Sequence, residues 1–258
     1  MNRTTNSGRG LALALLLPST ACLAPLSEAP AVTPQRPTFS SDTSTTAMGT
    51  YELEAGINYD HSDSFDTPLT LKRGLDEKSE VFVGFSPYKE LSMPGPNADG
   101  PGDTVVGYRR RFHEREDHSA AWMAAVKLPT GDEDDGLSSG EVDVFLAGIY
   151  SRQVEDLSLV GYYQLELLGE TTGSGFDVAH GMALAAGYPV APELSAFGEL
   201  AWQGGAETPD PLFVTLGAAY TVAPALVLDA AVVLGLNSQA PDVQLVVGFT
   251  RNMGRPGK

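Results

Sequence analysis

Charged residues occupy alternate positions in several stretches of this sequence, where they could face one another across neighbouring strands. The cationic candidates are Arg109, Arg111 and Lys127, and the acidic candidates are Glu141, Asp143, Glu166 and Glu199. An unpaired charge in a dry interior is costly, so such residues either pair with one another or line an aqueous lumen. One role is a constriction that selects solutes by charge; the other is structural pairing between strands. The two roles are compatible, and pairing is the favoured interpretation.

A second concentration of charge is the stretch "GDEDDG" at residues 131–136. Its carboxylates are Asp132, Glu133, Asp134 and Asp135. Hard cations such as calcium prefer oxygen ligands, and an acidic loop can also contact lipopolysaccharide through divalent ions. The spacing does not follow the EF-hand pattern, so a solvated surface loop is the favoured interpretation. We therefore predict no metal site here.

The four histidines, His61, His113, His118 and His180, do not form a recognisable catalytic motif. An outer-membrane lipid hydrolase would need a Ser–His pair, and no serine stands two residues from His180. His113 and His118 share a short acidic turn, where a metal site is one alternative and a polar turn is the favoured one. The sequence has neither zinc-ligand spacing nor a glycine-rich phosphate loop, so we predict no enzyme and no cofactor.

The elements that carry these residues repeat with a period of two from residue 49 onward. Successive residues of a strand point to opposite sides, so each run has one apolar and one more polar face. Most runs have the length of about ten residues that a tilted strand needs to cross a membrane. We predict twelve strands, at 50–60, 67–74, 78–89, 103–113, 119–128, 141–152, 156–169, 177–189, 193–204, 211–222, 225–236 and 241–252.

The links between these strands alternate in length. Short links at 75–78, 113–119, 153–156, 190–193 and 222–225 alternate with links that are mostly longer and rich in Gly, Pro and Asp. This pattern predicts an all-β fold, a transmembrane antiparallel up-and-down β-barrel of about 12 strands with short periplasmic turns and longer extracellular loops. A soluble β-sandwich or lipocalin-like barrel also alternates, but its large apolar residues would face inward.

The first 48 residues differ from the remainder. Residues 1–21 combine Arg3 and Arg9 with a short apolar stretch, which predicts a signal peptide too short to span a bilayer. Cys22 follows it. Either Cys22 is the lipidated first residue after an imperfect lipobox, or ordinary signal-peptidase cleavage occurs after Ala21 or Ala24. Residues 22–48 are rich in Pro, Ser and Thr and predict a flexible linker. The remaining boundaries are a barrel over 49–253 and a C-terminal extension over 254–258.

The composition limits the partners. The net charge of −17 leaves no basic face to neutralise phosphates, which excludes nucleic acid. The expected surroundings are outer-membrane lipid and lipopolysaccharide, reached by secretion across the inner membrane.

Two long stretches carry a family resemblance. "GDTVVGYRRRF" with the following "LPTG", acidic loop and "SGEVD", and the closing "GAAYTVAPALVLDAAVVLGLNSQAPDVQLVVGFT", resemble the outer-membrane family called "putative MetA-pathway of phenol degradation". The similarity covers residues 50–252. It implies a transporter-like barrel and a link to aromatic-compound metabolism. Such barrels often end on an aromatic residue that the barrel-assembly machinery reads, which here would be Phe249, or Met253 in its place.

These observations predict a passive outer-membrane channel for small solutes, hydrophobic or aromatic ones included. A non-conducting structural or surface-binding outer-membrane protein is the alternative. A barrel of this size can also be narrow or plugged, and residues 23–47 folding inward is one way to plug it.

Overall fold

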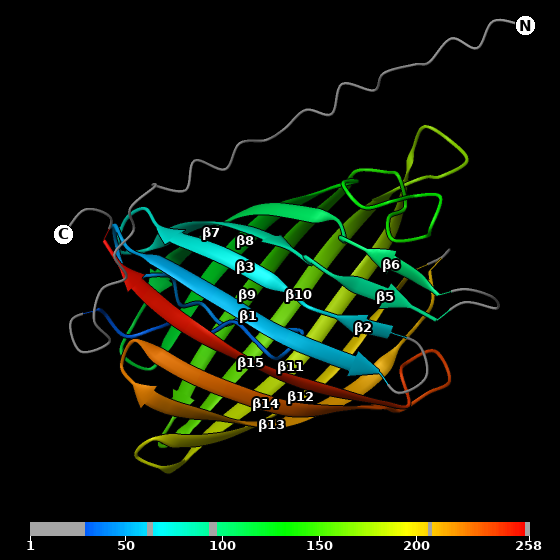
Figure 1. Cartoon of the computed structure of the whole chain (residues 1–258). Helices are drawn as coiled ribbons and strands as arrows, with labels where there is room; N and C mark the ends of the chain where they lie inside the picture. Colours follow the sequence, from blue (N-terminus) through cyan, green and yellow to red (C-terminus); the bar gives the residue numbers. More distant parts are fainter. Residues whose placement is uncertain (1–28, 61–63, 93–96, 206–207, 256–258) are drawn as a thin grey trace, which may run out of the picture.

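The structure is a computed structural model that describes residues 29–60, 64–92, 97–205 and 208–255. In this part of the chain, twelve antiparallel strands pair in sequence and close into a barrel where β15 meets β1 (Figure 1). The barrel strands are β1 (Tyr51–Asp60), β3 (Leu69–Gly74), β4 (Ser79–Phe85), β7 (Thr104–Glu114), β8 (His118–Leu128), β9 (Asp143–Val154), β10 (Leu157–Gly169), β11 (Phe176–Ala191), β12 (Leu194–Gly205), β13 (Leu212–Ala223), β14 (Leu226–Gly235) and β15 (Val243–Gly254).

The predicted fold class is confirmed, and most strand boundaries fall within two residues of the predicted ones. The largest difference is the run predicted at 78–89, where β4 ends at Phe85. Pro87 has no backbone N–H to donate to a neighbouring strand, which explains the interruption. Three short strands lie in predicted loops: β2 (Ser64–Asp66), β5 (Lys89–Leu91) and β6 (Ala98–Gly100). They extend the sheet beyond β1 at the end of the barrel that carries the longer loops.

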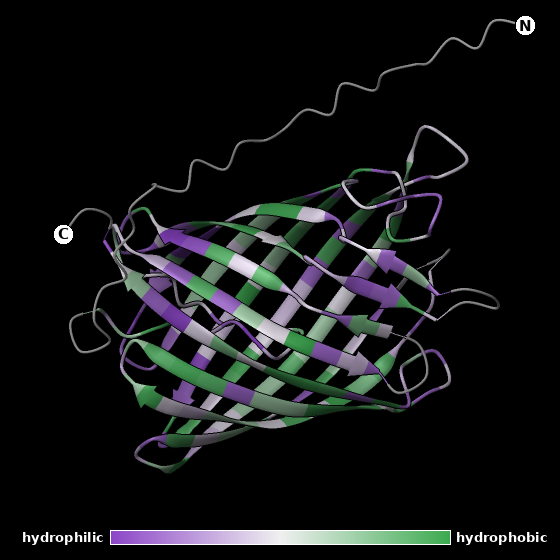
Figure 2. Cartoon of the chain, viewed as in Figure 1, coloured by the Kyte–Doolittle hydropathy of each residue, from purple (hydrophilic) through white to green (hydrophobic). Residues whose placement is uncertain are grey.

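Hydrophilic and hydrophobic residues are interspersed along the barrel strands (Figure 2), and the buried ionisable side chains lie inside the barrel while large apolar ones are exposed outside. The largest fully buried side chains include Lys72, Glu52 and Glu80, whereas Leu184 is 70% exposed on the outer face. A water-soluble barrel has the reverse distribution, so this outer face suits lipid tails. The described residues contain no helix with the length and hydropathy to cross a membrane.

Residues 29–50, here called the inner segment, lie inside the barrel (Figure 1). The segment begins near the short-turn end, where the Val32 N–H donates to the carbonyl of Pro224 at 2.9 Å, and returns there at Gly49, which bonds to Gly74. The composition of residues 22–48 predicts a flexible linker. The described part of that stretch corresponds to the alternative of an inward-folded segment. The predicted signal peptide and Cys22 lie outside the described residues.

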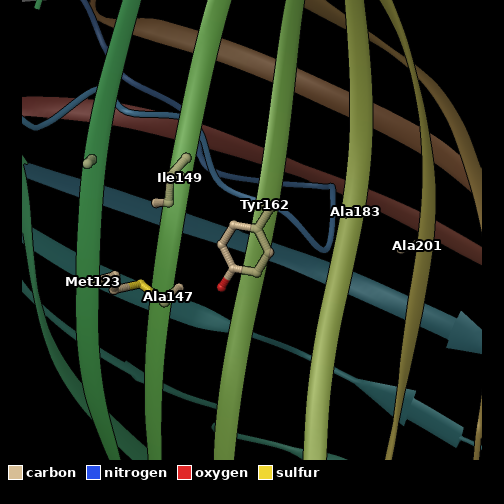
Figure 3. Packing of buried hydrophobic residues seen from close by; sticks show 7 residues of the cluster. Met123, Ala147, Ile149, Tyr162, Ala183 and Ala201 are labelled. Atoms are coloured by element: carbon tan, nitrogen blue, oxygen red, sulfur yellow. The ribbon is translucent and has the colours of Figure 1, made fainter. Parts of the chain in front are cut away.

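The inner wall contains one apolar cluster among charged residues. Small and apolar residues of β8 to β12 form one cluster, which contacts Phe39 of the inner segment; its buried members are Ala121, Met123, Ala147, Ile149, Tyr162, Ala183 and Ala201 (Figure 3). The Phe39 ring meets Tyr162 edge-on, with their centroids 5.8 Å apart. Buried charged residues lie on β1, β3, β4, β7 and β14, and also on the cluster strands β9, β10 and β12.

Candidate functional site

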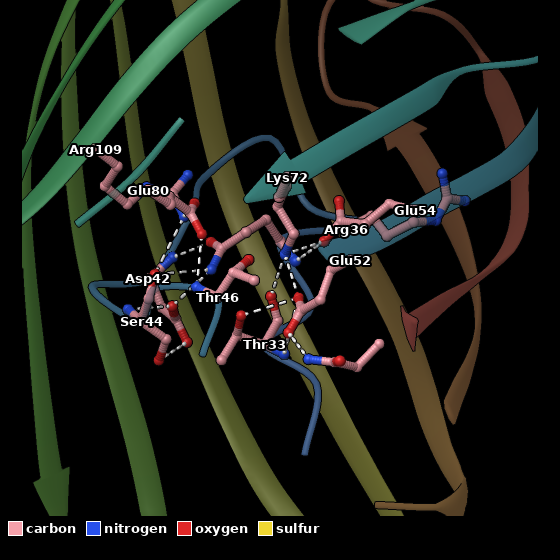
Figure 4. Close-up of polar contacts among 12 residues, drawn as sticks. Thr33, Arg36, Asp42, Ser44, Thr46, Glu52, Glu54, Lys72, Glu80 and Arg109 are labelled. Atoms are coloured by element: carbon pink, nitrogen blue, oxygen red, sulfur yellow. Dashed lines mark hydrogen bonds and ion pairs between the residues drawn. The ribbon is translucent and has the colours of Figure 1, made fainter. Parts of the chain in front are cut away.

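The inner segment is held by buried carboxylates of the wall, which accept hydrogen bonds from its backbone N–H groups (Figure 4). A hydrogen bond to an ionised acceptor is stronger than one between neutral groups, and it needs no particular side chain on the donor residue. The bonds run from Gln35 N to Glu54 (2.8 Å), from Phe39 N and Ser40 N to Glu199 (2.8 Å each), and from Thr46 N to Glu80 (2.7 Å).

Lys72 lies beside Glu54, the carboxylate that accepts from Gln35 N. Its Nζ atom lies 2.9 Å from Glu52 and 2.8 Å from Glu54, and it donates to the Thr33 carbonyl at 2.6 Å. Only 2% of the Lys72 side chain is exposed. Glu52 in turn accepts from Thr33 N at 3.3 Å. The lysine therefore joins two strands of the barrel to the beginning of the inner segment.

Arg36 attaches the middle of the inner segment to the seam of the barrel. Its Nε atom lies 3.1 Å from Asp229, and its Nη2 atom donates to the Val247 carbonyl at 3.0 Å. Gly56 and Gly248 pair across the β1–β15 seam. A Cβ atom on either would approach the guanidinium to 2.2 and 2.4 Å, so the two glycines form the slot that receives Arg36.

Replacing Gly56 with alanine should displace Arg36 and leave the Asp229 carboxylate without its partner. We expect the free energy of unfolding to fall by about 1–3 kcal/mol, the usual cost of overpacking. The measurement is urea unfolding of the refolded protein in lipid vesicles. Gly148→Ala is the matched control, because a Cβ there meets nothing within 4 Å. Equal losses in the two variants would contradict the slot.

A cavity of about 530 Å³ lies between the inner segment and the loop end of the barrel. Gln35, Arg36 and Pro37 contribute to it from the inner segment, and Ser86 and Asp103 line it near the loops. Its wall is mixed: the charged side chains include Glu54, Lys72, Glu80 and Arg109, and the large apolar ones include Phe82, Phe85, Met123 and Phe145. The cavity can therefore accommodate a solute with one polar and one apolar side.

The three cations predicted for a constriction occupy three separate places. Arg109 faces Glu80 at 3.3 Å and donates to the Ser44 carbonyl at 3.4 Å, so it contacts the inner segment. Arg111 lies at the short-turn end, where it pairs with Glu114 at 3.4 Å and donates to the Glu77 carbonyl. Neither arginine is paired with a predicted acidic partner.

Lys127 and Asp143 do meet, at 2.6 Å across β8 and β9 near the loop end. Asp103 joins them, 3.5 Å from the lysine. This group has two carboxylates for one ammonium and so carries one net negative charge.

The remaining predicted acids are dispersed. Glu166 is 1% exposed and accepts hydrogen bonds from Gln164 and Gln203 at 2.9 Å. Glu199 holds the inner segment. Glu141 precedes β9, beside Gly169. The structure therefore distributes the charges over the height of the lumen rather than in one ring.

Glu80, Asp103 and Arg36 are not among the site residues that the sequence predicts. Glu80 shares the face of Phe82 and Gly84, opposite the apolar Val81, so alternation could have identified it. Arg36 could not be identified by period, because the inner segment has none. The sequence offers one indication of its role. Arg36 is the single arginine of residues 22–48, and the strands that follow in the sequence carry many carboxylates.

The acidic loop and His180 make local contacts. The carboxylate of Asp132 accepts from Asp135 N at 3.2 Å, as expected for a turn. Within the described ranges, no three His, Cys, Asp or Glu side chains are grouped to hold a metal ion. His180 Nδ1 lies 2.8 Å from the Tyr163 hydroxyl.

Comparisons with known proteins agree with this architecture. The sequence model of the family described as "Putative MetA-pathway of phenol degradation" matches residues 34–250. Among solved structures, an outer membrane channel from Pseudomonas putida F1 is similar, with a TM-score of 0.69, 15% identity, and coverage of 84% of this chain and 100% of that one. The KdgM porin gives 0.57 at 10% identity, and the NanC porin 0.55 at 10% identity, each covering 78% of this chain and 98% of its own. At these identities the likeness shows the fold. A search of curated proteins finds no match.

Proposed function

The chain belongs to the family described as "Putative MetA-pathway of phenol degradation", and on that premise we propose that it is a passive channel of the outer membrane. The observation that carries the proposal is the cavity of about 530 Å³ inside a closed barrel with an apolar outer face. Solutes enter this cavity from the loop end and pass beside the inner segment. Diffusion needs neither a cofactor nor a catalytic residue.

We propose small amphipathic solutes, aromatic ones included, as the class that passes. The rings of Phe82, Phe85 and Phe145 offer apolar contacts to a ring, while Arg109 offers a hydrogen bond to its polar substituent. The family description names phenol degradation, which is consistent with this solute class.

The orientation follows from the two ends of the barrel. Short turns face the periplasm in outer-membrane barrels and longer loops face outside. Both ends of the inner segment then lie on the periplasmic side, where a chain secreted through residues 1–21 would begin its fold. In this orientation the cavity faces the medium and the inner segment is the barrier below it.

Single-channel recording of the refolded full chain in a planar bilayer tests the proposal. We expect discrete current steps whose size rises with salt concentration. One observation supports the alternative of a non-conducting structural protein: the inner segment is tightly bound inside the barrel. Silence from both the full chain and a folded variant without that segment would establish this alternative and reject the channel.

The charged group at the loop end should set a preference for cations. Asp103→Asn removes one negative charge beside Lys127 while its amide oxygen can still accept from Thr130 N and Gly131 N, which now bond at 3.0 Å. We expect the ratio of potassium to chloride permeability, measured from the reversal potential in a salt gradient, to fall. The matched control is Asp76→Asn in a short turn outside the lumen. A drop of the same size in both variants would contradict a role for Asp103.

A lipid hydrolase finds no support in the contacts. His180, the histidine on the outer face of β11, bonds to the phenol of Tyr163 rather than to a serine.

A further inference from the structure

We propose that His113 and His118 form a binding site for one borderline transition-metal ion, Cu²⁺, Ni²⁺ or Zn²⁺, at the short-turn end of the barrel. The two residues flank the turn between β7 and β8. Their Nε2 atoms lie 3.2 Å apart, and their ring centroids are 5.1 Å apart. Because the nitrogens are closer than the centroids, the rings approach each other through these atoms. Imidazole is a preferred ligand of these three ions. The site is independent of the proposed channel.

The separation of the two nitrogens matches a shared metal ion. Zinc–nitrogen bonds of 2.0–2.1 Å at a tetrahedral angle place two ligand nitrogens about 3.3 Å from each other. The observed 3.2 Å is close to that spacing. One N–H···N hydrogen bond between neutral rings also satisfies this distance. A metal titration distinguishes the two arrangements.

Asp117 fixes the orientation of His118. Its Oδ1 atom lies 2.7 Å from His118 Nδ1. A neutral ring that donates from Nδ1 to this carboxylate has its lone pair on Nε2, the atom that lies near His113. A carboxylate behind a ligating histidine is the usual second contact at metal sites and raises the basicity of the ligand.

The turn around the pair is anchored on both sides. Arg115 N donates to the His118 carbonyl, and Gln153 N on β9 donates to the Asp117 carbonyl, each at 2.8 Å. The His118 ring lies over Tyr150 with centroids 6.0 Å apart. Arg152 is the cross-strand neighbour of His118. The negative charge of Asp117 offsets the positive charge that Arg152 brings near the proposed metal ion. The His118 side chain is 32% exposed, so water can complete the coordination.

The test uses the untagged full chain, refolded in detergent, with Zn²⁺ and Ni²⁺ titrated by calorimetry and Cu²⁺ followed by electron paramagnetic resonance. We expect one ion per chain, a Cu²⁺ spectrum with two coupled nitrogens, and tightest binding for Cu²⁺. His113→Gln and His118→Gln should abolish saturable binding. Asp117→Asn should weaken it by about 10- to 100-fold, the usual cost of losing such a contact. His180→Gln is the matched control and should bind as the wild type does.

Heat-modifiable migration on gels verifies that each variant is folded. If one histidine variant does not fold, the other and Asp117→Asn carry the test. No saturable binding to the wild type, or binding unchanged in the folded variants, would overturn the site and leave a hydrogen bond between two histidines.

Discussion

A variant that lacks residues 29–47 is expected to conduct several times more current per channel than the full chain. Those residues lie in the lumen, and their backbone N–H groups donate hydrogen bonds to Glu54, Glu80 and Glu199. Removing them widens the path beneath the cavity. It also removes the Arg36 cation and exposes carboxylates to the lumen, so the preference for cations should increase at the same time.

The measurement is single-channel conductance and reversal potential in planar bilayers, with heat-modifiable migration to confirm folding. A matched control retains the segment and locks it. Thr43 and Ser119 contact each other through their hydroxyl oxygens, so Thr43→Cys with Ser119→Cys, in a Cys22→Ser background, can form a disulfide. The oxidised variant should conduct as the full chain does. An unchanged conductance in the folded deletion variant would show that the segment is not the barrier.

Replacing Lys72 with methionine is expected to lower the free energy of unfolding by about 3–5 kcal/mol, the usual result of removing one partner from a buried ion pair. Lys72 lies between Glu52 and Glu54 and is almost completely buried. Without it two neighbouring carboxylates remain out of water. The Thr33 carbonyl also loses its donor, so the beginning of the inner segment should loosen.

Urea unfolding in lipid vesicles, followed by tryptophan fluorescence, measures this loss. Lys78→Met is the matched control, because Lys78 is about half exposed and lies 3.9 Å from Glu114. An exposed pair of this kind contributes about 0–1 kcal/mol. Adding Glu52→Gln and Glu54→Gln to Lys72→Met should recover much of the loss, since no buried charge then remains in the group. Similar stability of the two single variants would contradict a structural role for Lys72.

The sequence predicts the faces of the strands well and the partners of individual charges less well. Alternation correctly turns Arg109 and Lys127 inward, because the side-chain period of a strand is two. Which residue each one meets depends on register. Lys127 is level with Asp143 on the adjacent strand, and they pair. Arg109 is level with Glu80 on β4, whereas the predicted acids lie at least two strands away.

The position of the inner segment could not be predicted from periodicity, for a different reason. Its contacts to the wall are made largely by backbone N–H groups, which every residue except proline has. A stretch rich in Pro, Ser and Thr therefore resembles a linker although the barrel holds it in place. The wall itself gives the indication of a bound segment, because it has more inward carboxylates than inward cations.

This mode of attachment has a consequence for descent. A substitution at a donor position changes the side chain and preserves the amide, so the hydrogen bond to the wall survives it, and only side-chain packing then restricts the choice of residue. Proline is the exception, and the segment's own prolines fall elsewhere. The heritable constraint on these bonds rests on the acceptors in the barrel, so among related chains Glu54, Glu80 and Glu199 should diverge slowly. The positions at which the bond itself survives every substitution but proline are Gln35, Phe39, Ser40 and Thr46.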